Sequence, residues 1–190
     1  RPIIYKLRYL ATQAPEIDAN RLYTDTLLKH DRLTGFLSRY GLMERIDQEI
    51  ARAKRFRNVF TLTVLTIRPL DSQPGVSASD YQSMCLADAA AQLKKTVRTV
   101  DIAARFSEQR LAVLMVQTGA QAANRALVRF LLQIKPSEGL AYRVSGSITA
   151  YQGESAEDLM LRAEHDARTK VVINKDNTRK YHFSLDDQQV

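Results

Sequence analysis

The chain has 190 residues, which is enough for one domain of ordinary size and a short extension. Hydrophobic residues make up 45% of the sequence, so a core can be buried, yet no run approaches the roughly 20 apolar residues that span a bilayer. The formal charge of +7 admits an anionic partner, but there is no Trp and no Cys/His finger spacing to support a nucleic-acid polymer. A single cysteine, Cys85, excludes an internal disulfide and favours a cytoplasmic protein.

Residues 1–30 carry apolar side chains at helical spacing, and Pro15 interrupts the pattern. This predicts two helical pieces rather than one long helix. The leucines suit docking on the same helix of a second chain, and they equally suit an ordinary amphipathic linker. We therefore expect a helical linker or dimerisation segment over 1–30 and one domain over 31–190.

Gly35 and Gly41 mark a segment rich in turn-forming residues, after which apolar residues at helical spacing predict a helix to about Arg57. Cations crowd the end of this helix, where they complement the helix dipole. We interpret them as a solvated helix end rather than a binding patch. They are Arg52, Lys54, Arg55 and Arg57.

Val59–Ile67 is rich in β-branched residues and predicts a strand, and a loop of Ser, Pro and Gly follows it over 71–79. A second helix comes next and runs into the segment Arg98–Asp101. Ile102–Phe106 and Leu111–Val116 then predict a hairpin. We expect the second helix to face inward with Met84, Ala87, Ala91, Leu93 and Val97.

A third helix is expected from Ala120 to the helix-stopping Pro136–Gly139. Tyr142–Tyr151 predicts a strand, Ala156–Thr169 a helix, and Arg179–Leu185 a final edge strand. Strands joined by both hairpins and helices indicate an α+β fold. We expect a central, mostly antiparallel sheet of about five strands flanked by helices.

Four short motifs occur in a shared order along this string of elements. Together they resemble the GGDEF family, the diguanylate cyclase domain of bacterial signalling proteins, over roughly residues 31–183. The resemblance implies a fold of the GGDEF or nucleotidyl-cyclase type. The motifs are Asp31–Gly35 with Arg39 after it, Arg98–Asp101 with Arg105 after it, Gly146–Thr149, and Arg162–Glu164.

The signature itself is absent, because Ser107–Leu111 reads SEQRL where the family has GGDEF. Arg110 occupies the place of the acidic residue that the resemblance implies as a metal ligand, and an Arg has no lone pair to give. Alignment of the first strand puts Thr66 and Arg68 at the positions of the other metal-binding carboxylates. We therefore expect no metal site, no cofactor and no enzyme activity, since cyclisation of GTP needs the metal.

The resemblance also implies a second, inhibitory site for cyclic di-GMP that uses an R-x-x-D motif. Arg98 and Asp101 fit its distance from the hairpin, Arg129 falls where the family adds another Arg, and Arg125 lies one turn earlier. A carboxylate can accept hydrogen bonds from guanine, and an Arg can donate to guanine or phosphate. R-x-x-D also occurs at Arg68–Asp71, so a surface ion pair is the alternative reading of either copy.

Three functions remain open at this stage. The first is a degenerate GGDEF domain that acts as a cyclic di-GMP receptor in bacterial second-messenger signalling. The second is a ligand-independent scaffold that forms a homodimer or docks on a partner protein or domain. The third is residual GTP binding or cyclase activity. In each case we expect a cytoplasmic domain, or the cytoplasmic part of a protein whose membrane contact lies outside this chain.

Overall fold

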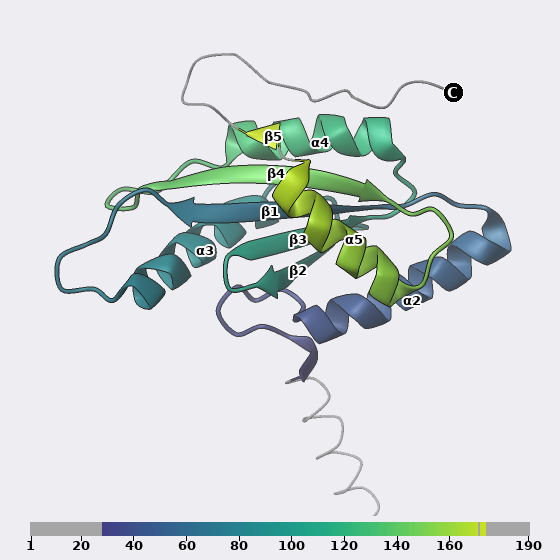
Figure 1. Ribbon diagram of the computed structural model, residues 1–190, viewed down its shortest axis with the longest axis horizontal. Coiled ribbons are helices and arrows are strands. Elements are labelled where there is room, and N and C mark those ends of the chain that lie inside the picture. The colour runs from purple at the N-terminus through teal and green to yellow at the C-terminus, as the bar shows by residue number, and fades with distance from the viewer. Residues whose placement is uncertain (1–27, 171, 174–190) are drawn as a thin grey trace, which may run out of the picture.

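The computed structural model describes residues 28–170, 172 and 173. The helices predicted before residue 28 and the edge strand predicted at Arg179–Leu185 lie outside the described residues. The described elements follow one another as Figure 1 shows. They are α2 (Arg39–Phe56), β1 (Thr61–Pro69), α3 (Ala78–Lys94), β2 (Ile102–Ser107), β3 (Arg110–Met115), α4 (Ala120–Gln133), β4 (Tyr142–Ala150), α5 (Ala156–Thr169) and β5 (Val172–Ile173).

The strands form one five-stranded sheet in the order β2-β3-β1-β4-β5. Every neighbouring pair is antiparallel, which confirms the predicted α+β fold around an antiparallel sheet. The hairpin predicted around Ser107–Arg110 is present as β2 and β3. The fifth strand is the two-residue β5, which the sequence did not indicate.

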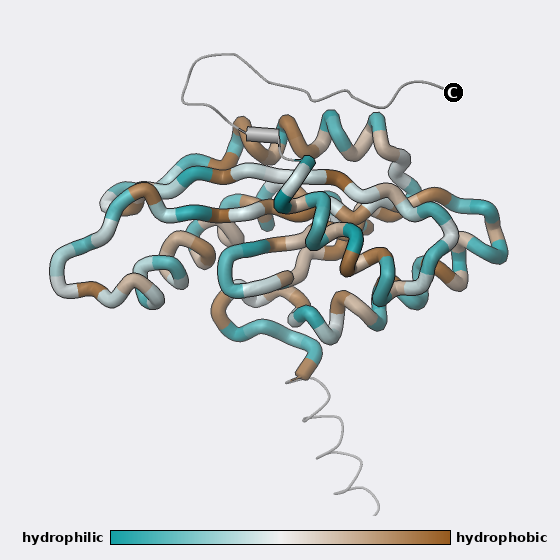
Figure 2. The backbone as a smooth tube through the Cα atoms, in the orientation of Figure 1, coloured by the Kyte–Doolittle hydropathy of each residue, from teal (hydrophilic) through white to brown (hydrophobic). Residues whose placement is uncertain are grey.

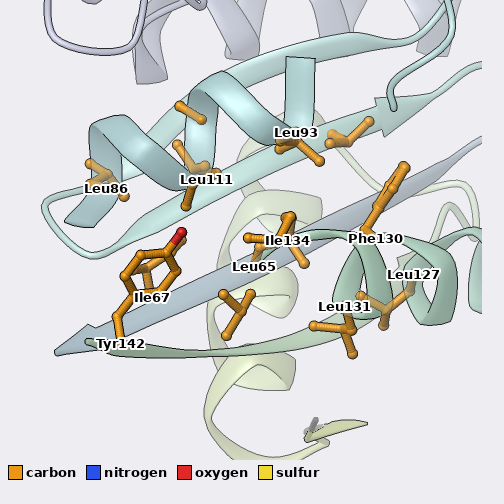
Figure 3. Close-up of a cluster of buried hydrophobic side chains, with 14 of the residues drawn as sticks. Leu65, Ile67, Leu86, Leu93, Leu111, Leu127, Phe130, Leu131, Ile134 and Tyr142 are labelled. Atoms are coloured by element: carbon orange, nitrogen blue, oxygen red, sulfur yellow. The ribbon is translucent and has the colours of Figure 1, made fainter. Parts of the chain in front are cut away.

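Two pairs of helices cover the two faces of the sheet (Figure 1). Leu65 and Ile67 of β1 join a core cluster with α3 and α4, and Figure 3 shows them among the leucines of those helices. Leu62 and Val64 point the opposite way, into a second cluster with α2 and α5. Side chains alternate along a strand, so the central β1 is apolar on both faces and joins the two cores.

Helix α3 faces the core with a different side from the one predicted. Met84 is 44% exposed and Ala91 is also exposed, so their predicted burial is wrong, whereas Leu93 is buried as predicted. Apolar residues occur on all sides of this alanine-rich helix, so the spacing of apolar residues did not determine which side faces the core. The larger side chains decide it. The buried residues are Tyr81, Cys85, Leu86, Ala89, Ala90 and Leu93.

The remaining helices show hydrophilic and hydrophobic residues alternating along their length (Figure 2), as expected for elements with one buried side. Helix α4 buries Ala123, Leu127, Phe130 and Leu131 on the side that faces the sheet. Helix α5 has the predicted bounds. Within the described residues, no helix has both the length and the apolar character needed to cross a membrane.

A polar network ties α3 to the segment between α4 and β4. Asp88 accepts hydrogen bonds from the Tyr142 hydroxyl at 2.6 Å and from the Ser137 backbone N–H at 3.2 Å. Burial raises the pKa of Asp88, but these bonds and one from Gln92 outweigh it and hold the pKa below its usual value. The network fixes the C-terminal end of α4 relative to α3. The other end of α4 is placed by its short connection to β3.

The segment before α2 lies along the outer edge of β2. Leu37 donates its backbone N–H to Ala103 at 3.1 Å and accepts one from Arg105 at 2.7 Å. The Arg105 side chain forms an ion pair of 2.9 Å with Asp31, whose carboxylate also accepts the backbone N–H of Thr34. The Asp31–Gly35 turn is therefore fastened to the hairpin.

Candidate functional site

The three metal-ligand positions implied by the resemblance lie towards one end of the sheet. Thr66 of β1 lies directly opposite Arg110 of β3 in the antiparallel register. Thr66 is buried, and Arg68 lies farther along β1 with an exposed side chain. The positions come together as the resemblance implies, but they carry a hydroxyl and two guanidinium groups.

Glu164 of α5 forms an ion pair with Arg110, and its carboxylate is shared by three arginines. Its oxygens lie 3.7 Å from Arg110, 3.4 Å from Arg39 and 3.0 Å from Arg168. Arg39 also donates to the carbonyl of Phe106 and lies over its ring, 4.5 Å from the centroid. One carboxylate thus faces three positive charges at the end of the hairpin.

This donor set does not fit the divalent metal that the family resemblance implies. Mg²⁺ binds through oxygen atoms, usually carboxylates, and surplus positive charge at the site repels it. Among the residues that the structure describes, no group of three or more His, Cys, Asp or Glu side chains is placed to hold a metal ion. No step of a metal-dependent reaction can be derived from these residues.

The R-x-x-D segment lies at the opposite end of the sheet, in the connection between α3 and β2. We expected Arg98 and Asp101 at a helix end, but α3 stops at Lys94, so that expectation is wrong. The last turn tightens, because the backbone N–H groups of Lys95 and Thr96 donate to carbonyls three residues earlier, those of Gln92 and Leu93. The Asp101 N–H instead donates to the Arg98 carbonyl at 3.1 Å and closes a turn.

The Asp101 carboxylate is partly buried and only partly satisfied. Its Oδ1 accepts a hydrogen bond of 3.2 Å from the backbone N–H of Val116. Burial raises the pKa of Asp101, although the Val116 bond and the positive charges of Arg98 and Arg129 oppose this rise. Three of the predicted ligand residues therefore come together here, from the α3–β2 turn and from α4.

The predicted arginines Arg98, Arg125 and Arg129 all have exposed side chains. In the described part of the chain, no carboxylate lies within ion-pair distance of Arg98, Arg125 or Arg129. The alternative reading of this R-x-x-D as a surface ion pair is therefore not what the structure contains. Arg125 lies one turn before Arg129 on α4, and among the described residues nothing joins it to Asp101.

Two contacts at these sites could not be predicted from the sequence. Glu164 was visible only as part of a short motif, and its spacing to Arg168 was the one signal that it would form ion pairs. The Val116 N–H carries no sequence signal, because any residue but Pro supplies a backbone donor.

Comparison with known proteins agrees with the fold and with the family resemblance. The family model "Diguanylate cyclase, GGDEF domain" matches residues 28–171. The diguanylate cyclase DgcP of Pseudomonas aeruginosa is 30% identical over 160 residues, which are 75% of this chain but 23% of DgcP, so the chain spans about a quarter of that relative.

Two solved structures share the fold. The coiled coil and GGDEF domain of DgcB from Caulobacter crescentus, in complex with c-di-GMP, has a TM-score of 0.65 at 15% identity and covers 90% of this chain and 94% of its own. The diguanylate cyclase SiaD from Pseudomonas aeruginosa, in complex with its activator SiaC, has a TM-score of 0.60 at 20% identity and covers 88% and 71%. On the family match, this chain belongs to the GGDEF domain family of diguanylate cyclases.

Proposed function

We propose that this domain is a cyclic di-GMP receptor without cyclase activity. One observation supports the proposal: the charges of Arg98 and Arg129 act on the partly buried Asp101, and no carboxylate among the described residues lies within ion-pair distance of either guanidinium group. Burial makes a carboxylate with few hydrogen-bond partners costly, and a ligand that donates to it relieves this cost. A site that is incomplete on its own is the arrangement expected of a receptor.

The chemistry of the three side chains suits a guanine nucleotide. The free oxygen of Asp101 can accept from the N1 and N2 hydrogens of guanine. Arg98 and Arg129 can donate to guanine O6 and N7 or to a phosphate. Support comes from the GGDEF domain of DgcB, which has the same fold and was solved in complex with c-di-GMP. Arg125, one turn away on α4, is a further phosphate donor in this proposal.

The proposed loss of cyclase activity rests on Thr66, Arg68 and Arg110. None of these side chains can replace a metal-binding carboxylate, and Arg110 is held by Glu164. Because the family has the fold of an enzyme, the loss of activity is tested separately, by assay for cyclic di-GMP formed from GTP and Mg²⁺.

Isothermal titration of the 190-residue protein with cyclic di-GMP tests the receptor. We expect saturable heat at pH 7 and a loss of about tenfold or more in affinity for Arg98→Ala and for Arg129→Ala, since each removes a charge-assisted contact. Arg55→Ala is the matched control, because Arg55, like Arg129, is an exposed helical arginine beside a Phe ring, but on the opposite face of the sheet. Absence of heat, or equal losses in all three variants, would overturn the receptor.

We also propose how the domain passes its signal on and where it is located. SiaD was solved with a protein activator, and docking of a partner protein, or dimerisation through residues 1–30, would carry the ligand signal onward here. We place the domain in the cytoplasm, where a lone buried thiol such as Cys85 stays reduced. If cyclic di-GMP produces no heat while the chain still self-associates, the ligand-independent scaffold replaces the receptor.

A further inference from the structure

The C-terminal end of α2 and the start of the connection to β1 form a corner of the molecule. Figure 1 shows this end of α2 reaching one extremity of the long axis. Two large apolar side chains are exposed on it, Phe56 by 59% and Val59 by 58%. We refer to the following residues as the α2 corner: Arg52, Lys54, Arg55, Phe56, Arg57 and Val59.

The cations of the α2 corner are mostly uncompensated. Arg52 forms an ion pair of 2.6 Å with Glu49. In the described part of the chain, no carboxylate lies within ion-pair distance of Lys54, Arg55 or Arg57. The Arg55 guanidinium lies 5.1 Å from the centroid of the Phe56 ring. Positive charge and apolar surface are therefore interleaved at one place.

A solvated helix end accounts for only part of this arrangement. The helix dipole favours cations in the last turn, but it gives no reason to expose Phe56 and Val59. Arg57 has a left-handed backbone with φ of 55°, a conformation in which Gly is the favoured residue. The chain thus places a cation where the backbone itself would favour glycine. Val100, 64% exposed, lies at the same end of the sheet, where β2 begins.

We propose that the α2 corner binds the surface of an anionic membrane. Interleaved cations and apolar side chains are the pattern of segments that lie at the headgroup boundary, with the cations on lipid phosphates and the apolar groups inserted. The corner is a projecting end, and a projecting end suits a deformable surface into which Phe56 and Val59 can insert. An acidic protein would need to supply a concave partner, so the membrane is the occupant to which we commit.

Vesicle co-sedimentation of the full 190-residue chain tests the proposal. The probes are vesicles of phosphatidylcholine alone and vesicles that contain about one third phosphatidylglycerol. We expect binding to the anionic vesicles only. It should weaken by about 30-fold in the double variant Arg55→Gln/Arg57→Gln, and by about tenfold in Phe56→Ser.

Matched controls change the same residue types outside the corner. Arg32→Gln removes an exposed cation, and Leu161→Ser removes an apolar side chain that is 63% exposed on α5. Both should bind anionic vesicles as the unchanged protein does. The proposal would be overturned if the control variants and the corner variants weakened binding equally. It would also be overturned if the unchanged protein failed to bind the anionic vesicles. Binding to soluble polyglutamate but not to anionic vesicles would overturn it in favour of an acidic protein partner.

Discussion

Thr66 and Arg110 face each other across β1 and β3, at two of the three positions where the family resemblance implies metal-binding carboxylates. The fold keeps these two residues opposite each other, but their side chains are a hydroxyl and a guanidinium group instead of carboxylates. Arg110 forms an ion pair with Glu164, and the same carboxylate also pairs with Arg39. The end of the sheet that would bind metal in a cyclase is here a cluster of charge-paired side chains.

We predict that the protein makes no cyclic di-GMP from GTP and Mg²⁺. Residues 66, 68 and 110 supply no carboxylate ligand, and the two arginines add positive charge that opposes a metal able to activate the attacking hydroxyl. Chromatographic detection of product after prolonged incubation, with an active GGDEF enzyme as positive control, is the measurement. Product that forms in proportion to protein concentration would refute the prediction.

We predict that Arg110→Glu lowers the free energy of unfolding by about 1 kcal/mol. The substitution removes a partner of Glu164 and places a second negative charge beside it. Arg110→Gln is the matched control, because it removes the ion pair without adding charge and should cost less. Urea denaturation measures both. The difference between them should shrink in high salt, which screens the repulsion. A Glu variant as stable as the Gln variant would contradict this account.

Binding of cyclic di-GMP should weaken as the pH falls. The Asp101 carboxylate must be ionised to accept hydrogen bonds from guanine, and burial raises its pKa above the usual 3.8. Protonation therefore begins at a higher pH than for an exposed aspartate. In calorimetric titrations we expect constant affinity around neutral pH and a progressive loss in acid that begins at a higher pH than the protonation of an exposed aspartate.

Asp101→Asn tests the same point by substitution. We expect it to weaken binding by about tenfold and to remove the pH dependence, because an amide does not titrate in this range. Asp71→Asn is the control, since Asp71 belongs to the other R-x-x-D segment and should leave both properties unchanged. Retention of the pH dependence in Asp101→Asn would assign it to another group.

The Asp31–Arg105 ion pair should contribute about 2 kcal/mol near neutral pH, because it is partly buried and shared with Thr34. Burial raises the pKa of Asp31, but the hydrogen bonds from Arg105 and Thr34 outweigh it, so the pKa lies below 3.8. A lowered pKa in the folded state stabilises the fold above the unfolded pKa. This stability is lost as the pH falls through the folded value.

Asp31→Asn should therefore be less stable than the unchanged protein by a constant amount above about pH 5, with the gap closing below about pH 4. Urea denaturation at several pH values measures the gap. Asp47→Asn, an exposed position on α2, is the control and should show no gap. A gap that persists undiminished at acid pH would show that the ion pair is not its source.

Gly146→Ala should destabilise the fold by about 1 to 3 kcal/mol through overpacking. A Cβ at Gly146 would lie 2.3 Å from a terminal carbon of Leu127 and 3.1 Å from one of Leu65, both buried. Ser147→Ala is the paired variant and should be neutral or stabilising, because the buried Ser147 hydroxyl has no hydrogen-bond partner. Thermal unfolding of the two variants should therefore shift in different directions. Equal shifts would argue against close packing of α4 on β4.

The elements of the fold could be predicted because each has a strong local signal. The β-branched run of β1, the hairpin residues of β2 and β3, and the apolar spacing of α4 and α5 all recur in the structure. The inward face of α3 could not be predicted, since its alanines provide no contrast between faces. The end of α3 was also missed, because it depends on which donors the Leu93 carbonyl accepts.

The sequence could predict the residues of the candidate site that are related by spacing along the chain, but not the contacts between distant elements. Sequence spacing indicated Arg98, Asp101 and Arg129, and the charges of both arginines act on the Asp101 carboxylate, but their role as a ligand site stays a prediction. The Val116 N–H and the sharing of Glu164 arise from tertiary packing between elements distant in the chain. The exposure of Phe56 and Val59 belongs to the same class, because a large apolar residue at the end of an element looks like core in a sequence.

The contact of Leu37 with β2 has a consequence for how copies of this protein can meet. A free sheet edge offers unpaired backbone groups to another chain, and Leu37 covers part of this edge with two hydrogen bonds. At the other edge of the described sheet, β5 pairs with β4 at only two positions. The Leu37 contact therefore closes the β2 edge near Ala103 and Arg105. Pairing of copies by continuation of the sheet should be disfavoured at β2, and a peptide that extends a sheet should not add there.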